Sequence, residues 1–227
     1  MKLIPILFST PMVQANQAGI KSQTRRITGK LKVVNEQLRH DWTVTPIAVK
    51  GGLPCFVFTA PGMADVVASS PYGKPGDVLW VRETYCPLVD HHWAKEQPYA
   101  YKADQTSADS DDYRQQYIKA GYPYQWKPSI HMPYAACRMW LQVKSVRVER
   151  LQDISEADAR AEGATQGIYR PYGENGCQLE VNEYARYVDG YRFIWHNING
   201  PGSWEKNPFV WVVEYQRIEK PQLTNDN

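Results

Sequence analysis

The sequence predicts a mainly β fold with peripheral helices, of the α+β class. Several short apolar segments have the alternation or the β-branched content that is typical of strands. Few segments have helical spacing, and the connections between the predicted strands are long. Because regular helical crossovers do not separate the strands, the pattern disfavours a doubly wound sheet. It favours a compact β-barrel with helices at its periphery.

The N-terminal part of the chain predicts a strand followed by a short helix. Residues 3–8 are almost entirely apolar and predict the strand. Residues 11–18 predict the helix, because Ser9 and Thr10 offer a hydroxyl cap and Pro11 is well suited to a first helical turn.

Three later segments predict the other strands of the core. A glycine- and proline-rich turn over residues 73–77 precedes an apolar run at residues 78–85. Residues 136–148 form a long β-rich run in which apolar and polar side chains mostly alternate. Residues 209–218 follow an Asn-Pro turn and predict the closing strand.

Two helices are expected between these strands. The first opens at Leu151, with Ser155 as its N-cap, Asp158 at the capping-box distance and Gly163 at its end. The second covers residues 183–197 and carries aromatic and aliphatic side chains at helical spacing.

We expect one domain over residues 1–218. Two stretches without clear periodicity are read as insertions, one at about residues 27–70 and an acidic one at about residues 87–128. Residues 219–227 are read as a polar tail. A chain of 227 residues is long enough to bury a core of this size.

Charge and composition limit the partners that the chain can bind. The net charge of +2 provides no global basic field for non-specific DNA binding, so a nucleic-acid contact must be local or made to a nucleoside-sized ligand. The 15 tyrosines and 8 tryptophans offer rings for stacking on bases, although most such rings pack in cores. No feature requires a protein partner.

Cysteine spacing and hydropathy indicate a cytoplasmic protein that needs no metal or other cofactor. The four cysteines are scattered and no Cys/His pair has zinc spacing. The apolar N-terminal run is short and Pro5 interrupts it, which disfavours a signal peptide. No stretch approaches the roughly 20 apolar residues of a membrane span.

Residues 19–26, which read GIKSQTRR, are the most informative segment. Lys21 and Thr24 lie three positions apart and would face opposite sides of a flat strand. A turn at Gly19 that leads into a strand can instead bring them together. A lysine beside a threonine hydroxyl can hold an activated nucleophile or an anion, whereas the alternative is a solvated basic loop.

This segment resembles the G-x-K-x-x-T-x-R signature of the ASCH domain, a member of the PUA-like β-barrel superfamily. Residues 76–83, which read GDVLWVRE, resemble a further strand motif of the family. Residues 128–133, 146–163 and 204–211 resemble segments of the larger, phage- and prophage-associated ASCH proteins. The similar segments cover most of the chain apart from the two insertions, and the resemblance implies a PUA-like β-barrel.

The resemblance also implies a reaction. One shorter ASCH group hydrolyses N4-acetylcytidine to cytidine and acetate, with a lysine and a threonine of the signature and a helical glutamate as its proposed catalytic residues. The first two match Lys21 and Thr24, and the third falls on Glu162, with Glu156 as a nearby alternative. Other members of the superfamily bind RNA or modified bases without this chemistry, and ribonuclease activity has been suggested for some.

Amide hydrolysis needs a nucleophile, a proton shuttle and stabilisation of an oxyanion. Thr24 can supply an alkoxide if Lys21 removes its proton, which requires that burial lowers the pKa of Lys21. Glu162 can orient Lys21 or pass a proton to the leaving nitrogen, although a carboxylate also raises a neighbouring lysine pKa. The structural alternatives are a Lys21–Glu162 ion pair and an ordinary strand threonine.

Seven further residues are candidates for substrate binding. Two arginines of the signature can hold RNA or a nucleotide, and Arg26 or Arg82 can polarise the acetyl carbonyl. Aromatic or polar side chains can stack on the base or bind its edge, although each is also a candidate for packing. The set comprises Arg25, Arg26, Tyr72, Trp80, Arg82, Glu83 and His131.

Three functions therefore stay open on the sequence. The first is an amidohydrolase that acts on N4-acetylcytidine-type nucleosides. The second is a non-catalytic module that binds RNA or a modified base. The third is a ribonuclease in which Lys21 and an arginine stabilise phosphate charge.

Overall fold

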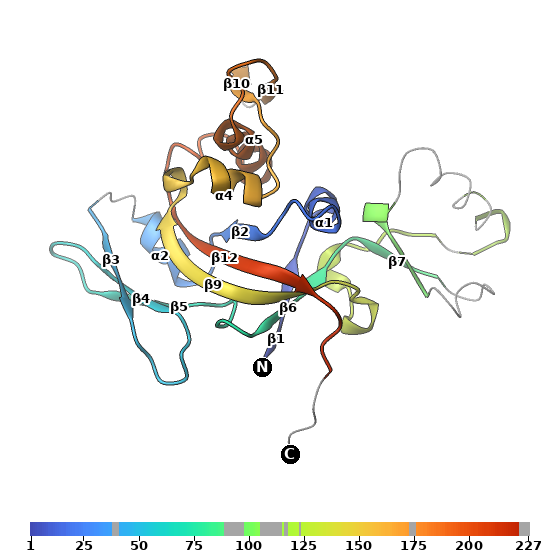
Figure 1. Ribbon diagram of the computed structural model, residues 1–227, viewed down its shortest axis with the longest axis horizontal. Helices are drawn as coiled ribbons and strands as arrows, with labels where there is room; N and C mark the ends of the chain where they lie inside the picture. The colour runs from blue at the N-terminus through green and yellow to red at the C-terminus, as the bar shows by residue number, and fades with distance from the viewer. Residues whose placement is uncertain are drawn as a thin grey trace.

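A five-stranded mixed sheet forms the centre of the computed structural model, which describes residues 1–37, 41–88, 98–104, 115, 118–122, 124–172 and 176–222 (Figure 1). The strand order is β1-β6-β9-β12-β2. Strands β1 and β6 are parallel, and the other neighbours are antiparallel. The bounds are Leu3–Leu7 for β1, Val78–Arg82 for β6, Trp140–Arg150 for β9, Phe209–Ile218 for β12 and Gln23–Arg26 for β2.

The sheet confirms the mainly β, α+β class, but no strand pairing among the described residues closes it into a barrel. The order begins with β1 and ends with β2, so these two strands are its edges. Strand β2 has four residues and pairs with β12 alone. The two edge strands are linked by a side chain: the Arg26 guanidinium of β2 donates a hydrogen bond of 2.9 Å to the Leu7 carbonyl at the end of β1.

Strand β12 is buried on both faces because two cores lie against it. Phe209, Trp211 and Val213 point into one core, whereas Val210 and Val212 point into the other. The alternation of side chains along a strand sends neighbours to opposite faces, so a strand between two cores is apolar throughout. This accounts for the continuous apolar run of the closing strand.

The first core is covered by the segment that the sequence indicated as an insertion at residues 27–70. It contains helix α2, Lys30–Glu36, and a three-stranded sheet of β3, Thr43–Ile47, β4, Cys55–Thr59, and β5, Val66–Ser69. Phe56 packs edge-on against Trp211 with ring centroids 5.7 Å apart, and Phe58 packs against Phe209 at 5.2 Å. The segment therefore contributes to the central core.

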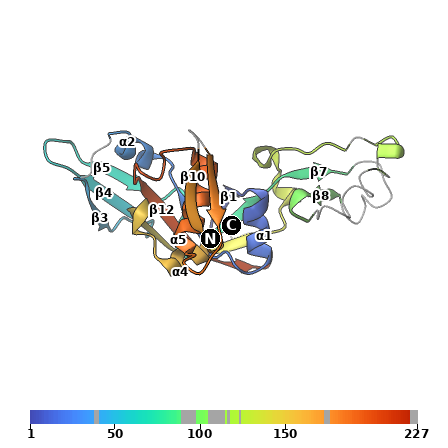
Figure 2. The ribbon, with the colours of Figure 1, turned by 90° about the horizontal axis from the view of Figure 1, so that it is seen from above.

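The second predicted insertion, at residues 87–128, falls partly outside the described residues. Within it, β8, Tyr99–Tyr101, pairs with β7, Tyr85–Pro87, and a short 3-10 turn follows at Lys102–Asp104. Figure 2 shows this pair on the opposite side of the molecule from β3, β4 and β5. Residues 223–227 of the predicted polar tail also lie outside the residues that the structure describes.

Three helices surround the candidate site. Helix α1, Thr10–Gln17, follows β1, and helix α4, Glu156–Ala161, follows a 3-10 turn at Leu151–Asp153. Ser155 caps α4 as predicted, because its Oγ accepts a hydrogen bond from the Asp158 amide at 3.1 Å. Helix α5, Tyr187–Asn199, begins later than predicted and follows an unpredicted hairpin of β10, Ile168–Tyr172, and β11, Gly176–Glu180.

Helix α5 approaches its neighbouring loop very closely at Gly190. A Cβ built there would lie 1.7 Å from the Thr165 carbonyl oxygen, so the helix can sit at this distance only with glycine. This contact fixes α5 beside α4 and above the edge of the central sheet (Figure 1).

Candidate active site

A tight turn brings Lys21 and Thr24 to one place. Helix α1 ends at Gln17 with Ala18 as its C-cap, and Gly19 has a φ of 71°, which glycine adopts without strain. The amides of Ile20 and Lys21 both donate to the Ala15 carbonyl, at 2.9 and 3.1 Å. The chain thus folds back on α1 before it enters β2, which is one of the two arrangements that the sequence left open.

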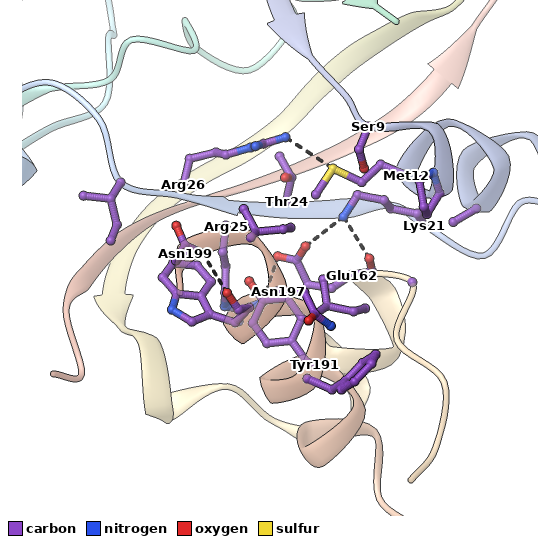
Figure 3. A pocket seen from close by; sticks show the side chains of 18 of the residues that line it. Ser9, Met12, Lys21, Thr24, Arg25, Arg26, Glu162, Tyr191, Asn197 and Asn199 are labelled. Atoms are coloured by element: carbon purple, nitrogen blue, oxygen red, sulfur yellow. Dashed lines mark hydrogen bonds and ion pairs between the residues drawn. The ribbon is translucent and has the colours of Figure 1, made fainter. Parts of the chain in front are cut away.

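Both side chains line a cavity of about 470 Å³ (Figure 3). Its walls come from α1, β2, the end of α4 and α5. Lys21, Thr24 and Glu162 all line it and are all buried. Apolar or aromatic side chains form much of the remaining wall, including Met12, Ile27, Tyr191, Phe193, Ile194, Trp195 and Ile198.

Lys21 and Glu162 form a buried ion pair. The Lys21 Nζ lies 2.8 Å from the Glu162 Oε2, and the two side chains are 1% and 3% exposed. The same Nζ donates to the backbone carbonyls of Glu162 at 2.9 Å and of Gln23 at 2.7 Å. Three acceptors match the three N–H groups of an ammonium, so this arrangement fits the charged form of Lys21.

Burial lowers the pKa of Lys21 from its usual value, even though Glu162 acts in the opposite direction. Desolvation of the ammonium is the larger effect, and the nearby guanidinium groups of Arg26 and Arg25 add to it. The sequence left open which of these effects prevails. In the structure the environment makes Lys21 a stronger acid than an ordinary lysine.

Arg25 holds the other oxygen of Glu162. Its Nη1 lies 3.3 Å from the Glu162 Oε1, and its other nitrogens contact Glu149 and Asp158. Arg147 joins the same network through Glu149, Asp158 and Glu214. Burial favours a raised Asp158 pKa, but Ser155, Arg25 and Arg147 outweigh it, so the pKa is lowered. Glu162 is therefore fixed by cations on both of its oxygens.

Arg26 is the cation of the cavity that lacks a carboxylate partner among the described residues. Its guanidinium donates to the Leu7 carbonyl and contacts the Met12 sulfur at 3.5 Å. It also lies over the Phe8 ring, 5.7 Å from the centroid. Its Nε is buried without a hydrogen-bond partner in the part of the chain that the structure describes. Arg26 therefore brings to the cavity a positive charge that no carboxylate of the described residues pairs with.

Sequence reasoning did not identify Ser9 or helix α5 as parts of the site. Ser9 occupies the N-cap position of α1 as expected, but its side chain makes no capping hydrogen bond and lines the cavity instead. Tyr191 and Trp195 are buried core residues that also form the cavity wall. The helical periodicity indicated their burial, but no sequence signal indicated that α5 covers β2.

Glu156, the alternative to Glu162, has a structural role. Its carboxylate accepts hydrogen bonds from the amides of Tyr187, at 2.8 Å, and Val188, at 3.1 Å. It therefore caps the first turn of α5. Of the two glutamates, only Glu162 lines the cavity.

Five of the predicted substrate-binding residues do not line this cavity, which corrects their grouping with Lys21. Strand β6 is separated from β2 by β9 and β12, so the residues at its end lie away from the signature. Trp80 packs edge-on against Tyr134 at 5.4 Å, and Arg82 donates to the Met132 and Ile130 carbonyls. Glu83 is buried in a bidentate pair with Arg138, with both contacts at 2.8 Å.

The other two of these five residues, Tyr72 and His131, also lie outside the cavity wall. Tyr72 is buried in the first core, where burial raises its pKa against smaller effects of Thr28 and Arg26. His131 is exposed at the end of a 3-10 turn at Ser129–His131. Arg25 and Arg26, by contrast, line the cavity.

Comparison with protein-family models, with curated proteins and with solved structures found no match. Within the described ranges, no helix is long and apolar enough to cross a membrane. The same residues contain no group of three His, Cys, Asp or Glu side chains placed to hold a metal ion.

Proposed function

We propose that the protein is an ASCH-type amidohydrolase of the PUA-like superfamily, which removes the acetyl group from N4-acetylcytidine-type nucleosides. The observation that carries this proposal is the meeting of Lys21, Thr24 and Glu162 in one cavity, with Lys21 Nζ 2.8 Å from Glu162 Oε2. These are the residues that match the proposed catalytic lysine, threonine and glutamate of the family that the sequence resembles.

The cavity is suited to a small planar ligand. Its volume of about 470 Å³ falls within the range of small-molecule sites. Met12, Tyr191 and Ile194 offer apolar surface to a pyrimidine ring. Lys21, Thr24 and Arg26 lie along the β2 side of the cavity (Figure 3), so the acetylated amide would lie there and the ring would lie against the apolar side chains of α1 and α5.

The ion pair can prepare both the base and the acid of the reaction. Transfer of one proton from the Lys21 ammonium to the Glu162 carboxylate leaves a neutral amine and a carboxylic acid. The amine must then turn its lone pair from Glu162 to Thr24, because the three partners of the Lys21 Nζ are Gln23 and Glu162 atoms. It takes the Thr24 proton as Oγ attacks the acetyl carbon, and the acid gives its proton to the leaving N4. Cytidine leaves, and water releases acetate from Thr24. The lowered pKa of Lys21 favours the first transfer.

Arg26 is the residue that we assign to the developing oxyanion. It lines the cavity, and none of the carboxylates that the structure describes pairs with its guanidinium. Preorganised donors at the carbonyl oxygen stabilise the tetrahedral intermediate of acyl transfer. Arg82, the other candidate from the sequence, donates to two backbone carbonyls next to β6.

Incubation with N4-acetylcytidine, followed by chromatography, tests the proposal. We expect cytidine and acetate in equal amounts from the wild type, and neither from a Lys21→Met variant that retains its fold. Binding of N4-acetylcytidine without any product would instead identify a modified-base reader. Cleavage of an RNA strand without deacetylation would identify a ribonuclease.

A further inference from the structure

A second cavity of about 680 Å³ lies next to the candidate active site. Ile27, Trp195 and Asn199 line both cavities, so the two share a wall built from the end of β2 and the C-terminal half of α5. The two cavities are therefore neighbours, which is the arrangement that a ligand larger than a nucleobase would need in order to occupy both.

The second cavity carries an excess of positive charge. Lys32, Arg150 and Lys206 line it, and they come from α2, β9 and the segment before β12. The carboxylates in its wall are Glu36 and Glu205. Glu205 is already paired with Arg192, at 2.6 Å.

Arg150 is held in place at the inner side of this cavity. Its guanidinium lies 3.8 Å from the centroid of the Phe209 ring, and its Nη1 donates to the Asn207 carbonyl at 3.2 Å. A guanidinium fixed by stacking and by a backbone contact needs little further ordering to bind an anion. Lys32 and Lys206 are exposed side chains that can close over the same anion.

The shared wall also contains an unused donor. The indole Nε1 of Trp195 is buried and has no hydrogen-bond partner among the residues that the structure describes. A buried N–H without a partner is unfavourable, so a ligand oxygen would satisfy it if the wall adjusted to expose it.

We propose that the second cavity is a subsite for a phosphate group attached to the nucleoside whose base occupies the first cavity. The inference rests on the proposed function, and it narrows the substrate class from a free nucleoside to a nucleotide or a nucleotide within RNA. The two sources share the phosphate, which Arg150, Lys32 and Lys206 recognise.

Calorimetric titration with product-like ligands tests the subsite without any need for turnover. The ligands are cytidine, cytidine 5′-monophosphate, cytidine 3′-monophosphate and a cytidine-containing dinucleotide. We expect at least one phosphate-bearing ligand to bind about tenfold more tightly than cytidine at low salt, and this additional affinity to decrease as the salt concentration rises. Additional affinity for the dinucleotide alone indicates RNA as the natural ligand, and additional affinity for a monophosphate indicates a nucleotide.

Paired variants locate the effect. The Lys32→Gln/Lys206→Gln variant should lose most of the additional affinity for phosphate-bearing ligands, with Arg150 retaining the rest, and should keep the affinity for cytidine. Lys144→Gln removes an exposed lysine of β9 that lines neither cavity, so it should retain the full additional affinity. Equal affinity for cytidine and all phosphate-bearing ligands would overturn the subsite, as would an additional affinity that is undiminished in the double variant.

The outcome is separable from that of the deacetylation assay. Additional affinity for phosphate-bearing ligands without turnover of any acetylated ligand would support the subsite and contradict the proposed amidohydrolase activity. Turnover of N4-acetylcytidine without additional affinity for phosphate-bearing ligands would support the amidohydrolase activity and contradict the subsite.

Discussion

Lys21 and Glu162 meet at 2.8 Å although they are 141 positions apart in the chain. The contact joins the turn before β2 to the end of α4, and both side chains are almost completely buried. A buried ion pair contributes little net stability compared with apolar residues of the same shape, but loss of one partner leaves an uncompensated charge. Substitutions in this ion pair are therefore expected to change the stability of the protein as well as its catalysis.

The Glu162→Gln variant should be strongly destabilised. The Lys21 ammonium would then lie buried opposite a neutral amide, and loss of one partner of a buried pair costs about 3–5 kcal/mol of unfolding free energy. Urea denaturation of the wild type and the variant measures this difference. The matched control is Glu180→Gln, which breaks an exposed pair with Arg170 and should cost less than about 1 kcal/mol.

The double variant Lys21→Met/Glu162→Gln should recover part of the stability that Glu162→Gln loses, because it removes the uncompensated charge as well. Equal losses in Glu162→Gln and Glu180→Gln would contradict the account of a buried pair.

The free energy of unfolding should depend on pH through Lys21. Because burial lowers the Lys21 pKa in the folded chain below 10.5, the unfolded chain binds more protons at this site between the lowered pKa and 10.5. The wild type should therefore gain stability relative to Lys21→Met as the pH rises from the lowered pKa toward 10.5.

Denaturation of both proteins at several pH values measures this dependence. Burial raises the pKa of Tyr191 and Tyr215, which lowers stability at high pH, but the two proteins share this effect and it cancels in the difference. Parallel profiles, or a wild type that loses stability relative to the variant, would show that the Lys21 pKa is not lowered.

Arg26 and Arg82 should differ in their effects on turnover. Arg26→Met removes the donor that we assign to the oxyanion, and loss of one such donor lowers kcat by about 10²–10³-fold. Arg82→Met removes contacts to the Met132 and Ile130 carbonyls outside the cavity and should leave kcat nearly unchanged. Steady-state kinetics with N4-acetylcytidine compare the two. A larger loss in Arg82→Met would place the oxyanion elsewhere.

The parts of the site that the sequence predicted are those governed by local rules. The Gly19 turn, the short β2 and the Ser155 cap each follow from a few neighbouring residues, and each is found in the structure. The position of Glu162 at the end of α4 follows from the same cap and from Gly163, which has a φ of 86°. The family resemblance supplied its pairing with Lys21.

The parts that the sequence did not predict depend on how distant elements pack. Trp80, Arg82 and Glu83 are polar or aromatic residues near a motif, but the strand order puts two strands between them and β2. Trp195 reads as a core residue from its helical spacing, and only the position of α5 makes it part of the cavity. The segment at residues 27–70 joins the first core through contacts of Phe56 and Phe58 with Trp211 and Phe209, which are about 150 positions away in the chain, and no local pattern in the segment indicates such contacts.

The Thr24 hydroxyl tests the central claim most directly. Thr24→Val keeps the β-branched shape in the buried strand and removes the nucleophile, whereas Thr24→Ser keeps the hydroxyl. With N4-acetylcytidine as the substrate, we predict that Thr24→Val retains its fold and loses at least about 10³-fold in kcat, and that Thr24→Ser keeps measurable turnover. Turnover by a folded Thr24→Val variant at the wild-type rate would contradict the account.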